Sequence, residues 1–394
     1  MKIGIIGGGP GGAVTAATLA RRGHHAHIYE AEVFPRFHIG ESLLPCNMLI
    51  YEDLGISHAV FRAHSYQPKR GAHFEQVSTG RTARFRFADG LPGDPPEIYQ
   101  VERSRFDKLL LDHAIACGAT LHSPVTVTSV DLEQGAIIHA GGRETYDFIV
   151  DASGRETLIG RQLDLVDRAG DLMRAAFFGH IGNLPLPPGA EIGDISIAKA
   201  DEGWCWQIPL SATKWSIGMV LRRERIQRGG APDAVFRQHI GMFPTVEKRL
   251  KGQIPDPVRA IPNISYRVRE RLGRRFALLG DAGGFIDPIF SSGVLLATRA
   301  AWRLGCALAE GGVDADLSKW KAQTDHDLST FFTFIRMWYD GHFIDNLFFS
   351  DHRDDSISRG IVSLLAGNTT HPDNMFLSML VKRMASQKAR TLVL

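Results

Sequence analysis

Three glycines near the start of the chain have the spacing of a phosphate-binding turn. Gly7, Gly9 and Gly12 fall in residues 7–12, a run of five glycines and one proline. We expect Gly7 to permit a tight turn, Gly9 to let the backbone approach a pyrophosphate, and Gly12 to let a helix pack closely on a strand. The free amides at the start of that helix would then bind phosphate oxygens.

The residues around this turn complete a dinucleotide-binding unit. Apolar runs at Ile3–Ile6 and Ala26–Tyr29 predict two strands, and the alanine-rich segment Ala13–Arg22 predicts a helix between them. The second strand ends at Glu30, where a carboxylate accepts both hydroxyls of an adenosine ribose. A glycine motif alone is weak, but a strand, a turn, a helix, a strand and an acid in this order are specific.

A second turn of interest lies late in the chain. The apolar run Phe276–Leu279 predicts a buried strand that leads into Gly280 and Asp281. Residues 288–293 predict a turn before a helix over Gly293–Glu310. The first amides of such a helix have no partner within it, so they form a potential anion site.

An aromatic stripe and a lysine are the remaining candidates. Trp204, Trp206 and Ile208 alternate along a predicted strand, so they share one face and form an apolar wall. Such a stripe, taken alone, is more often core packing than a barrier. Lys69 lies in a predicted turn, where a lysine is usually solvated, although an amine removed from water becomes nucleophilic.

The composition excludes several classes of protein. A net charge of +2 over 394 residues gives no basic field for nucleic acid. The most apolar stretch, Val294–Ala309, is interrupted by Arg299 and Arg303, so we expect no membrane insertion. A first strand that begins at Lys2 leaves no room for a signal peptide, and we expect a cytoplasmic protein.

The cysteines and histidines predict neither a disulfide framework nor a metal site. The cysteines lie far apart and without CxxC spacing, at Cys46, Cys117, Cys205 and Cys306. The 16 histidines are scattered, with no HxxxH pair on a clear helix. This pattern is typical of a reducing compartment.

The order of the elements predicts an α/β protein with an insertion. A Rossmann-like domain is assembled from residues 1–66, 99–165 and 260–315, and a mostly antiparallel β-sheet substrate domain comprises residues 67–98 and 166–259. Residues 316–394 form a helical C-terminal region. Other predicted elements include helices at Asn47–Leu54, Arg103–Cys117 and Pro232–Leu250, and inserted strands at Gly71–Val77, Arg81–Phe87, Ala175–Ile181, Ile195–Ala200, Trp204–Pro209 and Trp215–Leu221.

Together these segments resemble a known family. The glycine turn, the helix at Arg103, the sequence DASG at 151–154 and the Gly280–Asp281 turn are similar to the hydroxybenzoate-hydroxylase-like FAD monooxygenase fold. The sequences GESLLP at 40–45, WCWQIP at 204–209 and GDAGGFIDPIFSSG at 280–293 narrow the resemblance to the flavin-dependent halogenases. The similar branch acts on phenols or pyrroles, either free or bound to a carrier protein.

The resemblance implies FAD as the cofactor. The residues that it implies in FAD binding are Gly7, Gly9, Gly12, Glu30, Arg36, Glu41, Ser42, Arg103 and Asp281. Arg36 and Arg103 would face phosphate. Glu41 and Ser42 would reach the flavin ring or ribityl chain, and Asp281 would accept ribityl hydroxyls. The alternative for Glu41 or Arg103 is an ordinary charge at a helix start.

The resemblance also implies where halide and substrate meet. In the family, chloride or bromide sits on backbone amides that match Ser292 and Gly293, although hydroxylases of the same fold use such amides for a flavin oxygen. Trp204 and Trp206 would separate flavin from substrate. The Lys69 amine would bind hypohalous acid or become a haloamine, and Arg70 is the neighbour most easily mistaken for it.

The implied activity is chlorination of an electron-rich aromatic, with hypochlorous acid made from O2, chloride and reduced FAD and delivered through Lys69. A separate flavin reductase would supply the reduced FAD, because no second glycine fingerprint is present for a nicotinamide. The alternatives are an FAD-dependent aromatic monooxygenase or isoprenoid-type reductase that ignores halide, and a flavin-binding protein without turnover.

Two features depart from the family pattern. Phe290 occupies a position at which tryptophan halogenases carry glutamate, and the C-terminal part is shorter than in many relatives. The tail is rich in aromatic residues, namely Phe331, Phe332, Phe334, Trp338, Tyr339, Phe343, Phe348 and Phe349. They are interpreted as core packing or the face of a homodimer, or as the closure of a substrate pocket.

Overall fold

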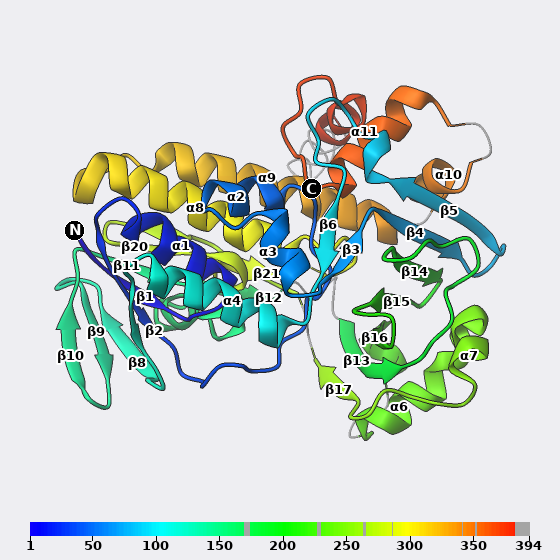
Figure 1. Cartoon of the computed structure of the whole chain (residues 1–394), viewed down its shortest axis with the longest axis horizontal. Helices are drawn as coiled ribbons and strands as arrows, with labels where there is room; N and C mark the ends of the chain where they lie inside the picture. Colours follow the sequence, from blue (N-terminus) through cyan, green and yellow to red (C-terminus); the bar gives the residue numbers. More distant parts are fainter. Residues whose placement is uncertain are drawn as a thin grey trace, which may run out of the picture.

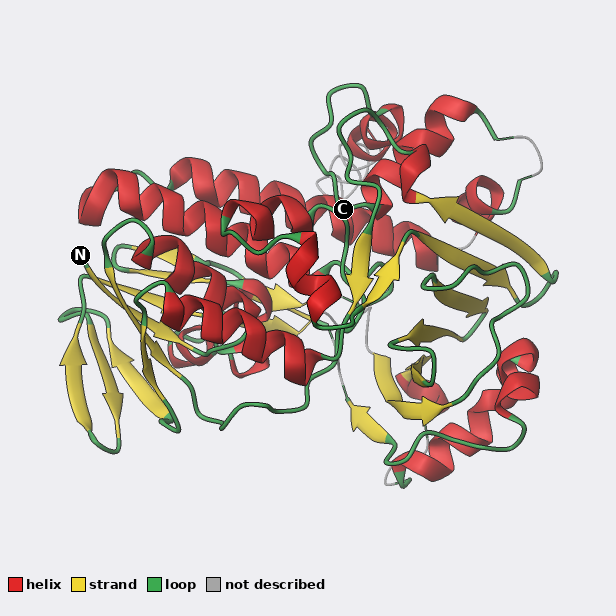
Figure 2. Cartoon of the chain, in the orientation of Figure 1, coloured by secondary structure: helices red, strands yellow, loops and turns green. Residues whose placement is uncertain are grey.

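The chain folds into two halves that lie one after the other along the longest axis of the molecule (Figure 1). The computed structural model describes residues 1–168, 174–226, 230–262, 265–285, 287–340, 342–350 and 353–382. One half carries a parallel sheet with helices packed on it, and the other carries a curved, mostly antiparallel sheet (Figure 2). The predicted α/β class with an inserted sheet is confirmed.

The first half is built on a six-stranded sheet in the order β19-β20-β11-β1-β2-β7. Every neighbouring pair is parallel except β19 with β20. The bounds are β1 Lys2–Ile6, β2 His25–Tyr29, β7 Thr120–His122, β11 Phe148–Asp151, β19 Leu272–Gly273 and β20 Phe276–Leu278. These strands come from the three chain segments predicted for the dinucleotide-binding domain; the domain boundaries themselves stay a prediction.

Long helices pack in this half, and the first turns of α1 and α8 lie beside each other. They are α1 (Pro10–Ala20), α4 (Arg103–Ala116), α8 (Gly293–Gly311) and α9 (Ser318–Tyr339). Helix α1 packs against both α4 and α8. A Cβ built on Gly305 would lie 2.6 Å from Thr18 Cγ2, so this glycine permits the close approach of α8 to α1.

The second half is a seven-stranded sheet in the order β17-β13-β16-β15-β14-β4-β5. All neighbouring pairs are antiparallel except β14 with β4. The bounds are β4 Gly71–Gln76, β5 Arg81–Arg86, β13 Arg174–Gly182, β14 Ile195–Ala200, β15 Gly203–Pro209, β16 Lys214–Arg222 and β17 Arg259–Ile261. Alternate residues of β15 enter different cores: Trp204 and Trp206 join the main core, whereas Cys205 joins the core beneath α6 and α7.

Shorter elements complete the described chain. The helices are α2 Asn47–Asp53, α3 His58–Ala63, α5 Leu158–Gln162, α6 Pro232–His239, α7 Pro244–Leu250, α10 His342–Phe348 and α11 Asp355–Leu365. The strands are β3 Gln67–Lys69, β6 Ile98–Gln100, β8 Val127–Asp131, β9 Ala136–His139, β10 Gly142–Thr145, β12 Val166–Arg168, β18 Tyr266–Val268 and β21 Gly284–Phe285.

Two sequence predictions were wrong in detail. The single helix expected over Pro232–Leu250 is divided into α6 and α7, because Pro244 has no N–H to continue the helix and instead starts a new one. Strand β10 was missed, since its residues Gly142–Thr145 are polar and show no apolar alternation. It forms a hairpin with β9.

The aromatic tail packs largely into the core, as the first interpretation expected. Phe331, Phe334, Trp338 and Phe348 are at most 1% exposed. Phe290 joins them by stacking on Phe334. The side chain of Phe343 lies outside the described residues.

The four cysteines are free. Within the described ranges, no cluster of His, Cys, Asp and Glu could hold a metal ion. No helix in that part of the chain is long and apolar enough to cross a membrane.

Candidate functional site

A cavity of ≈ 1450 Å³ runs between the two halves. Its walls include most of the residues that the sequence singled out, namely Gly7, Gly9, Glu30, Arg36, Glu41, Ser42, Arg103, Trp204, Trp206, Asp281 and Gly293. Gly12, Lys69 and Ser292 are not among its lining residues. The fold therefore brings together residues that are separated by up to nearly 300 positions.

The glycine turn has the geometry that its spacing predicts. Gly7 has φ +102°, a conformation that favours glycine, and its N–H donates to the Tyr29 carbonyl. A Cβ on Gly12 would overlap the Gly7 carbonyl oxygen. A Cβ on Gly9 would meet only Arg36 Nη2, at 3.5 Å, so the backbone there is open to the cavity.

Glu30 is held at the end of β2 by two backbone groups. Its Oε2 accepts the Gly8 N–H over 2.7 Å, and its Oε1 accepts the Glu32 N–H over 2.8 Å. The side chain lines the cavity while its residue is only 5% exposed. Each carboxylate oxygen keeps a lone pair for a further donor such as a ribose hydroxyl.

Arg36 and Arg103 share one buried carboxylate. Arg103 makes a two-pronged pair with Asp107, with Nε–Oδ1 at 2.6 Å and Nη2–Oδ2 at 2.9 Å, while Arg36 Nη1 lies 3.1 Å from Oδ2. Arg103 also donates to the Ile39 carbonyl. Arg36 Nε also lies 3.2 Å from Glu32 Oε2. Both arginines line the cavity beside the glycine turn, and the guanidinium N–H groups that the two carboxylates do not use can donate to a diphosphate.

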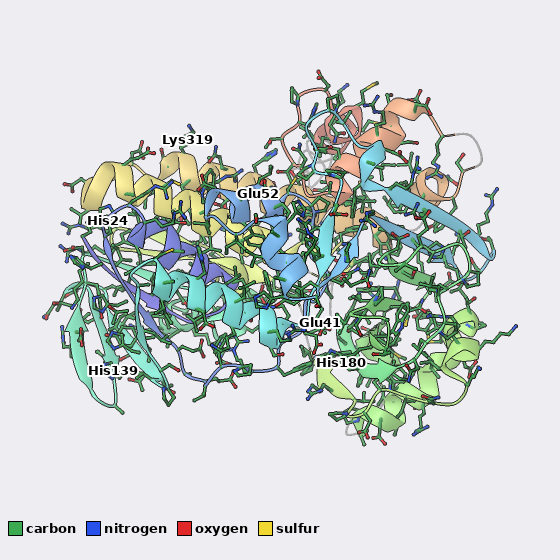
Figure 3. All side chains as sticks on the ribbon, in the orientation of Figure 1. His24, Glu41, Glu52, His139, His180 and Lys319 are labelled. Atoms are coloured by element: carbon green, nitrogen blue, oxygen red, sulfur yellow. The ribbon has the colours of Figure 1, made fainter. Side chains whose placement is uncertain are left out.

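Glu41 and Ser42 present unpaired polar atoms at the cavity wall. His180 Nε2 on β13 donates to Glu41 Oε1 over 2.7 Å, and Figure 3 shows the two side chains together where the halves meet. Within the described part of the chain, Glu41 Oε2 and Ser42 Oγ are buried without a hydrogen-bond partner. Buried polar atoms are rarely left unpaired, so both favour a bound ligand.

Asp281 lies on the far wall, in the short 3-10 helix Gly280–Gly283 that follows β20. Burial raises its pKa to about 6, although the Arg103 charge opposes that rise. Its carboxyl group is therefore mostly ionised at neutral pH and takes up a proton just below it. It can either accept or donate a hydrogen bond to a hydroxyl-bearing ligand.

The turn at residues 288–293 ends in the start of α8. Ser291 has φ +57°, and among the described residues the Ser292 and Gly293 amides have no backbone partner. Gly293 borders both the large cavity and a second one of ≈ 30 Å³, which is also lined by Ser292, Asp281 and Asp287. That volume is enough for one water-sized species.

Trp204 and Trp206 form a continuous aromatic surface on β15. Their ring centroids lie 5.7 Å apart, and Phe178 continues the surface 5.8 Å beyond Trp206. Both tryptophans and Ile208 line the cavity, so the predicted shared face is confirmed. Trp206 Nε1 donates to Ser216 Oγ and Trp204 Nε1 donates to Tyr339 Oη.

Lys69 is buried, not solvated. It is 1% exposed at the end of β3, and its Nζ donates to the Leu43 carbonyl over 2.7 Å. Burial lowers the pKa of Lys69 to about 7, against a smaller opposing effect of Asp194. Arg70, by contrast, is paired with Glu97 and its side chain is 63% exposed.

The residues present fit FAD. The glycine-rich start of α1, the Glu30 carboxylate at the end of β2, and the guanidinium groups of Arg36 and Arg103 line one end of the cavity. The unpaired atoms of Glu41 and Ser42 lie along it. This combination matches an adenosine ribose, a diphosphate and a polar flavin chain in that order.

Sequence reasoning missed three residues of the site. Asp107 follows Arg103 by one helical turn, which is a usable signal for an ion pair. Asp287 stands directly before the turn at residues 288–293. His180 carries no local signal, because only the packing of β13 brings it to the site. Tyr339 was named only as one of the aromatic residues of the tail, and its hydrogen bond to Trp204 was not predicted.

Comparisons with known proteins agree with this geometry. The family model "Tryptophan halogenase" matches residues 2–94 and 96–376. The chain is similar to the "Flavin-dependent halogenase gsfI" of Penicillium aethiopicum, with 30% identity over 375 residues, 84% of this chain and 69% of that protein.

Two further similarities cover nearly all of the chain. The "1H-pyrrole-2-carbonyl-[peptidyl-carrier protein] chlorinase" of Pseudomonas fluorescens is 28% identical over 386 residues, 89% of this chain and 86% of that protein. The crystal structure of a flavoprotein/dehydrogenase from Cytophaga hutchinsonii superposes with a TM-score of 0.86 at 29% identity, over 98% of this chain and 99% of that one. The chain therefore belongs to the tryptophan halogenase family of FAD-dependent halogenases.

Proposed function

We propose that this enzyme chlorinates an electron-rich aromatic compound, a phenol or a pyrrole, through the buried amine of Lys69. The observation that carries the proposal is the contrast between Lys69 and Arg70, because only Lys69 is withdrawn from water with a pKa near neutrality. An amine of this kind is a compact donor and a nucleophile at neutral pH.

The chemistry supplied by bound, reduced FAD is a two-electron reduction of O2 that, with chloride and one proton, yields hypochlorous acid, water and oxidised FAD. Ser292 and Gly293 border the small second cavity, and their amides have no backbone partner in the described chain, so they are our candidates for holding chloride. Gly7, Gly9, Gly12, Glu30, Arg36, Glu41, Ser42, Arg103 and Asp281 are proposed to hold FAD.

Trp204 and Trp206 are proposed to keep the substrate away from the flavin. Their rings cover one wall of the cavity, and Lys69 lies outside the set of residues that line it. The segment Ser42–Leu43 connects the two regions, since Ser42 faces the cavity and the Leu43 carbonyl accepts from Lys69. Hypochlorous acid would pass along this segment and be held by the amine.

The substrate class and the partners are also proposals. The relative from Pseudomonas fluorescens is described as acting on a pyrrole held by a peptidyl carrier protein. A phenol or pyrrole, free or tethered to a carrier protein, is our candidate substrate, and a separate flavin reductase is the proposed source of reduced FAD.

The test is Lys69→Met, which keeps an unbranched apolar side chain in the buried site but removes the amine. We expect FAD affinity within about twofold of the wild type and chlorinated product reduced by at least about a hundredfold, because the nucleophile is lost. Product mass with a flavin reductase, O2 and chloride measures the second quantity.

The matched control is Arg70→Met, one residue away and on the exposed side of the same segment. It should chlorinate at close to the wild-type rate. Chlorination that persists in Lys69→Met and fails in Arg70→Met would show that the wrong residue was chosen.

A second candidate is an FAD-dependent monooxygenase or reductase that ignores halide. It is favoured by the similarity to a structure described as a flavoprotein/dehydrogenase. The same assay without chloride separates the two: a product that gains oxygen or hydrogen at an unchanged rate supports this candidate.

A further inference from the structure

A chain of hydrogen bonds ties the tryptophan wall to the turn at the start of α8. The Trp204 Nε1–H donates to Tyr339 Oη over 2.8 Å, and the Tyr339 hydroxyl donates to Asp287 Oδ2 over 2.7 Å. Asp287 Oδ1 accepts the Ile289 N–H over 3.0 Å. Trp204 and Asp287 are at most 4% exposed.

The direction of this chain is set by the chemistry of its members. An indole nitrogen can only donate, and a phenol has one proton to give. The Tyr339 hydroxyl must therefore accept a hydrogen bond from Trp204 and donate one to Asp287. Burial raises the pKa of Tyr339 well above its ordinary value, so the phenol keeps that proton.

The chain joins three elements that are remote in sequence. Trp204 lies on β15, Asp287 follows β21, and Tyr339 is the last residue of α9. The Arg174 guanidinium on β13 lies 3.6 Å from the centroid of the Tyr339 ring and favours the ionised form of Asp287. The end of α9 is thus fixed from both sides.

The two tryptophans of the wall are held differently. Trp206 Nε1 donates to Ser216 on β16, the adjacent strand of its own sheet, over 3.2 Å. Trp204 has no such anchor within the sheet among the described residues and depends on Tyr339. Trp206 is therefore held within its own sheet, and Trp204 is held by α9.

We propose that Tyr339 and Asp287 are positioning residues that hold Trp204 against the halide-binding turn, so that the wall is complete only while the end of α9 is docked. The functional part of this inference rests on the proposed halogenase chemistry. Without the Tyr339 hydroxyl, the Trp204 N–H and Asp287 Oδ2 would both be buried and unpaired. The indole would then be held by packing alone, and we expect part of the oxidant to be lost before it reaches the substrate.

The direct test is Tyr339→Phe in the FAD-loaded protein, followed by hydrogen exchange of the tryptophan indole N–H groups by NMR. Trp204→Phe assigns the Trp204 signal. We expect the Trp204 indole proton to exchange about tenfold faster in Tyr339→Phe, since one hydrogen bond of ordinary strength is removed. The Trp206 proton should stay within about twofold, because Ser216 still holds it.

A matched control is Tyr146→Phe. Tyr146 is also buried and its hydroxyl is hydrogen-bonded, to Tyr29, at a place that does not line the cavity near Trp204. This variant should leave the Trp204 exchange rate unchanged. An unchanged Trp204 rate in Tyr339→Phe as well would overturn the positioning role.

A second readout connects the position of Trp204 to turnover. In Tyr339→Phe we expect the fraction of consumed reduced FAD that appears as chlorinated product to fall about fivefold, while the FAD dissociation constant changes by less than about twofold. Coupling equal to the wild type would contradict the functional part of the inference. If the wild type itself makes no chlorinated product but Trp204 exchange responds as expected, the proposed function fails and the positioning role stands.

Discussion

Two helix starts open on the same cavity, and different charged side chains surround them. Helices α1 and α8 pack together, each begins beside a glycine, and both present backbone to the cavity. Near the start of α1 lie the guanidinium groups of Arg36 and Arg103, which are paired with the carboxylates of Glu32 and Asp107. Near the start of α8 lie the carboxyl groups of Asp281 and Asp287.

The comparison teaches that side chains decide what a helix start binds. The amides and the helix dipole are the same at both places, and both favour an anion. At α1 the N–H groups of Arg36 and Arg103 suit a doubly charged diphosphate. At α8 the carboxyl groups of Asp281 and Asp287 oppose the attraction of the helix start for an anion, so we expect it to hold only a small anion, and to hold it weakly.

We expect the largest effect from a substitution that disrupts the start of α1 and leaves the start of α8 unchanged. Gly12→Ala places a Cβ on the Gly7 carbonyl oxygen, so we expect a loss of about 3 kcal/mol of folding free energy and of FAD retention. Gly293→Ala should keep both, because its Cβ would meet only Phe285, at 3.8 Å. Urea unfolding and bound-flavin absorbance measure the two quantities; equal losses in both variants would contradict the comparison.

A smaller effect should follow from Glu30→Ala, which acts on the adenosine end alone. Hydrogen bonds to a carboxylate contribute about 1.5–3 kcal/mol each, so losing the two to the ribose should weaken FAD binding by at least about a hundredfold. The halide KM should not change, because Glu30 is not among the residues that line the cavity at α8. Unchanged flavin affinity would exclude Glu30 as the ribose acceptor.

The smallest effect should appear as a difference in pH dependence. Burial raises the pKa of both Asp281 and Asp287 from 3.8 to about 6, so both bind more protons in the folded state between roughly pH 4 and 6. Lowering the pH from 7.5 to 5.5 removes negative charge at α8. We expect the halide KM to fall by up to about tenfold over that range.

Through these two groups, the stability of the folded protein should also increase as the pH falls. A carboxyl group whose pKa is raised by folding destabilises the folded state when it ionises. The contribution of Asp281 and Asp287 to the free energy of unfolding should therefore increase as the pH falls through 6 towards 4 and they take up protons. Asp281→Asn combined with Asp287→Asn should flatten that part of the stability profile. A halide KM that rises on acidification would show that the carboxyl groups do not act on the anion.

The dinucleotide-binding unit was predictable because its signals are local. The strand, the glycine turn, α1 and Glu30 fall within the first 30 residues, and the backbone requires glycine at positions 7 and 12. The alternation of Trp204, Trp206 and Ile208 likewise fixed which side chains share a face, since successive residues of a strand point in opposite directions.

The burial of Lys69 and the anchoring of Trp204 were decided by tertiary packing. Lys69 and Arg70 are adjacent and chemically alike in the sequence, yet the pairing of β3 with β6 buries one and exposes the other. Tyr339 reaches Trp204 only because α9 packs across the end of the sheet. Burial and pairing between distant segments set the pKa and the position of a side chain, and neither quantity is encoded in the residues immediately around it.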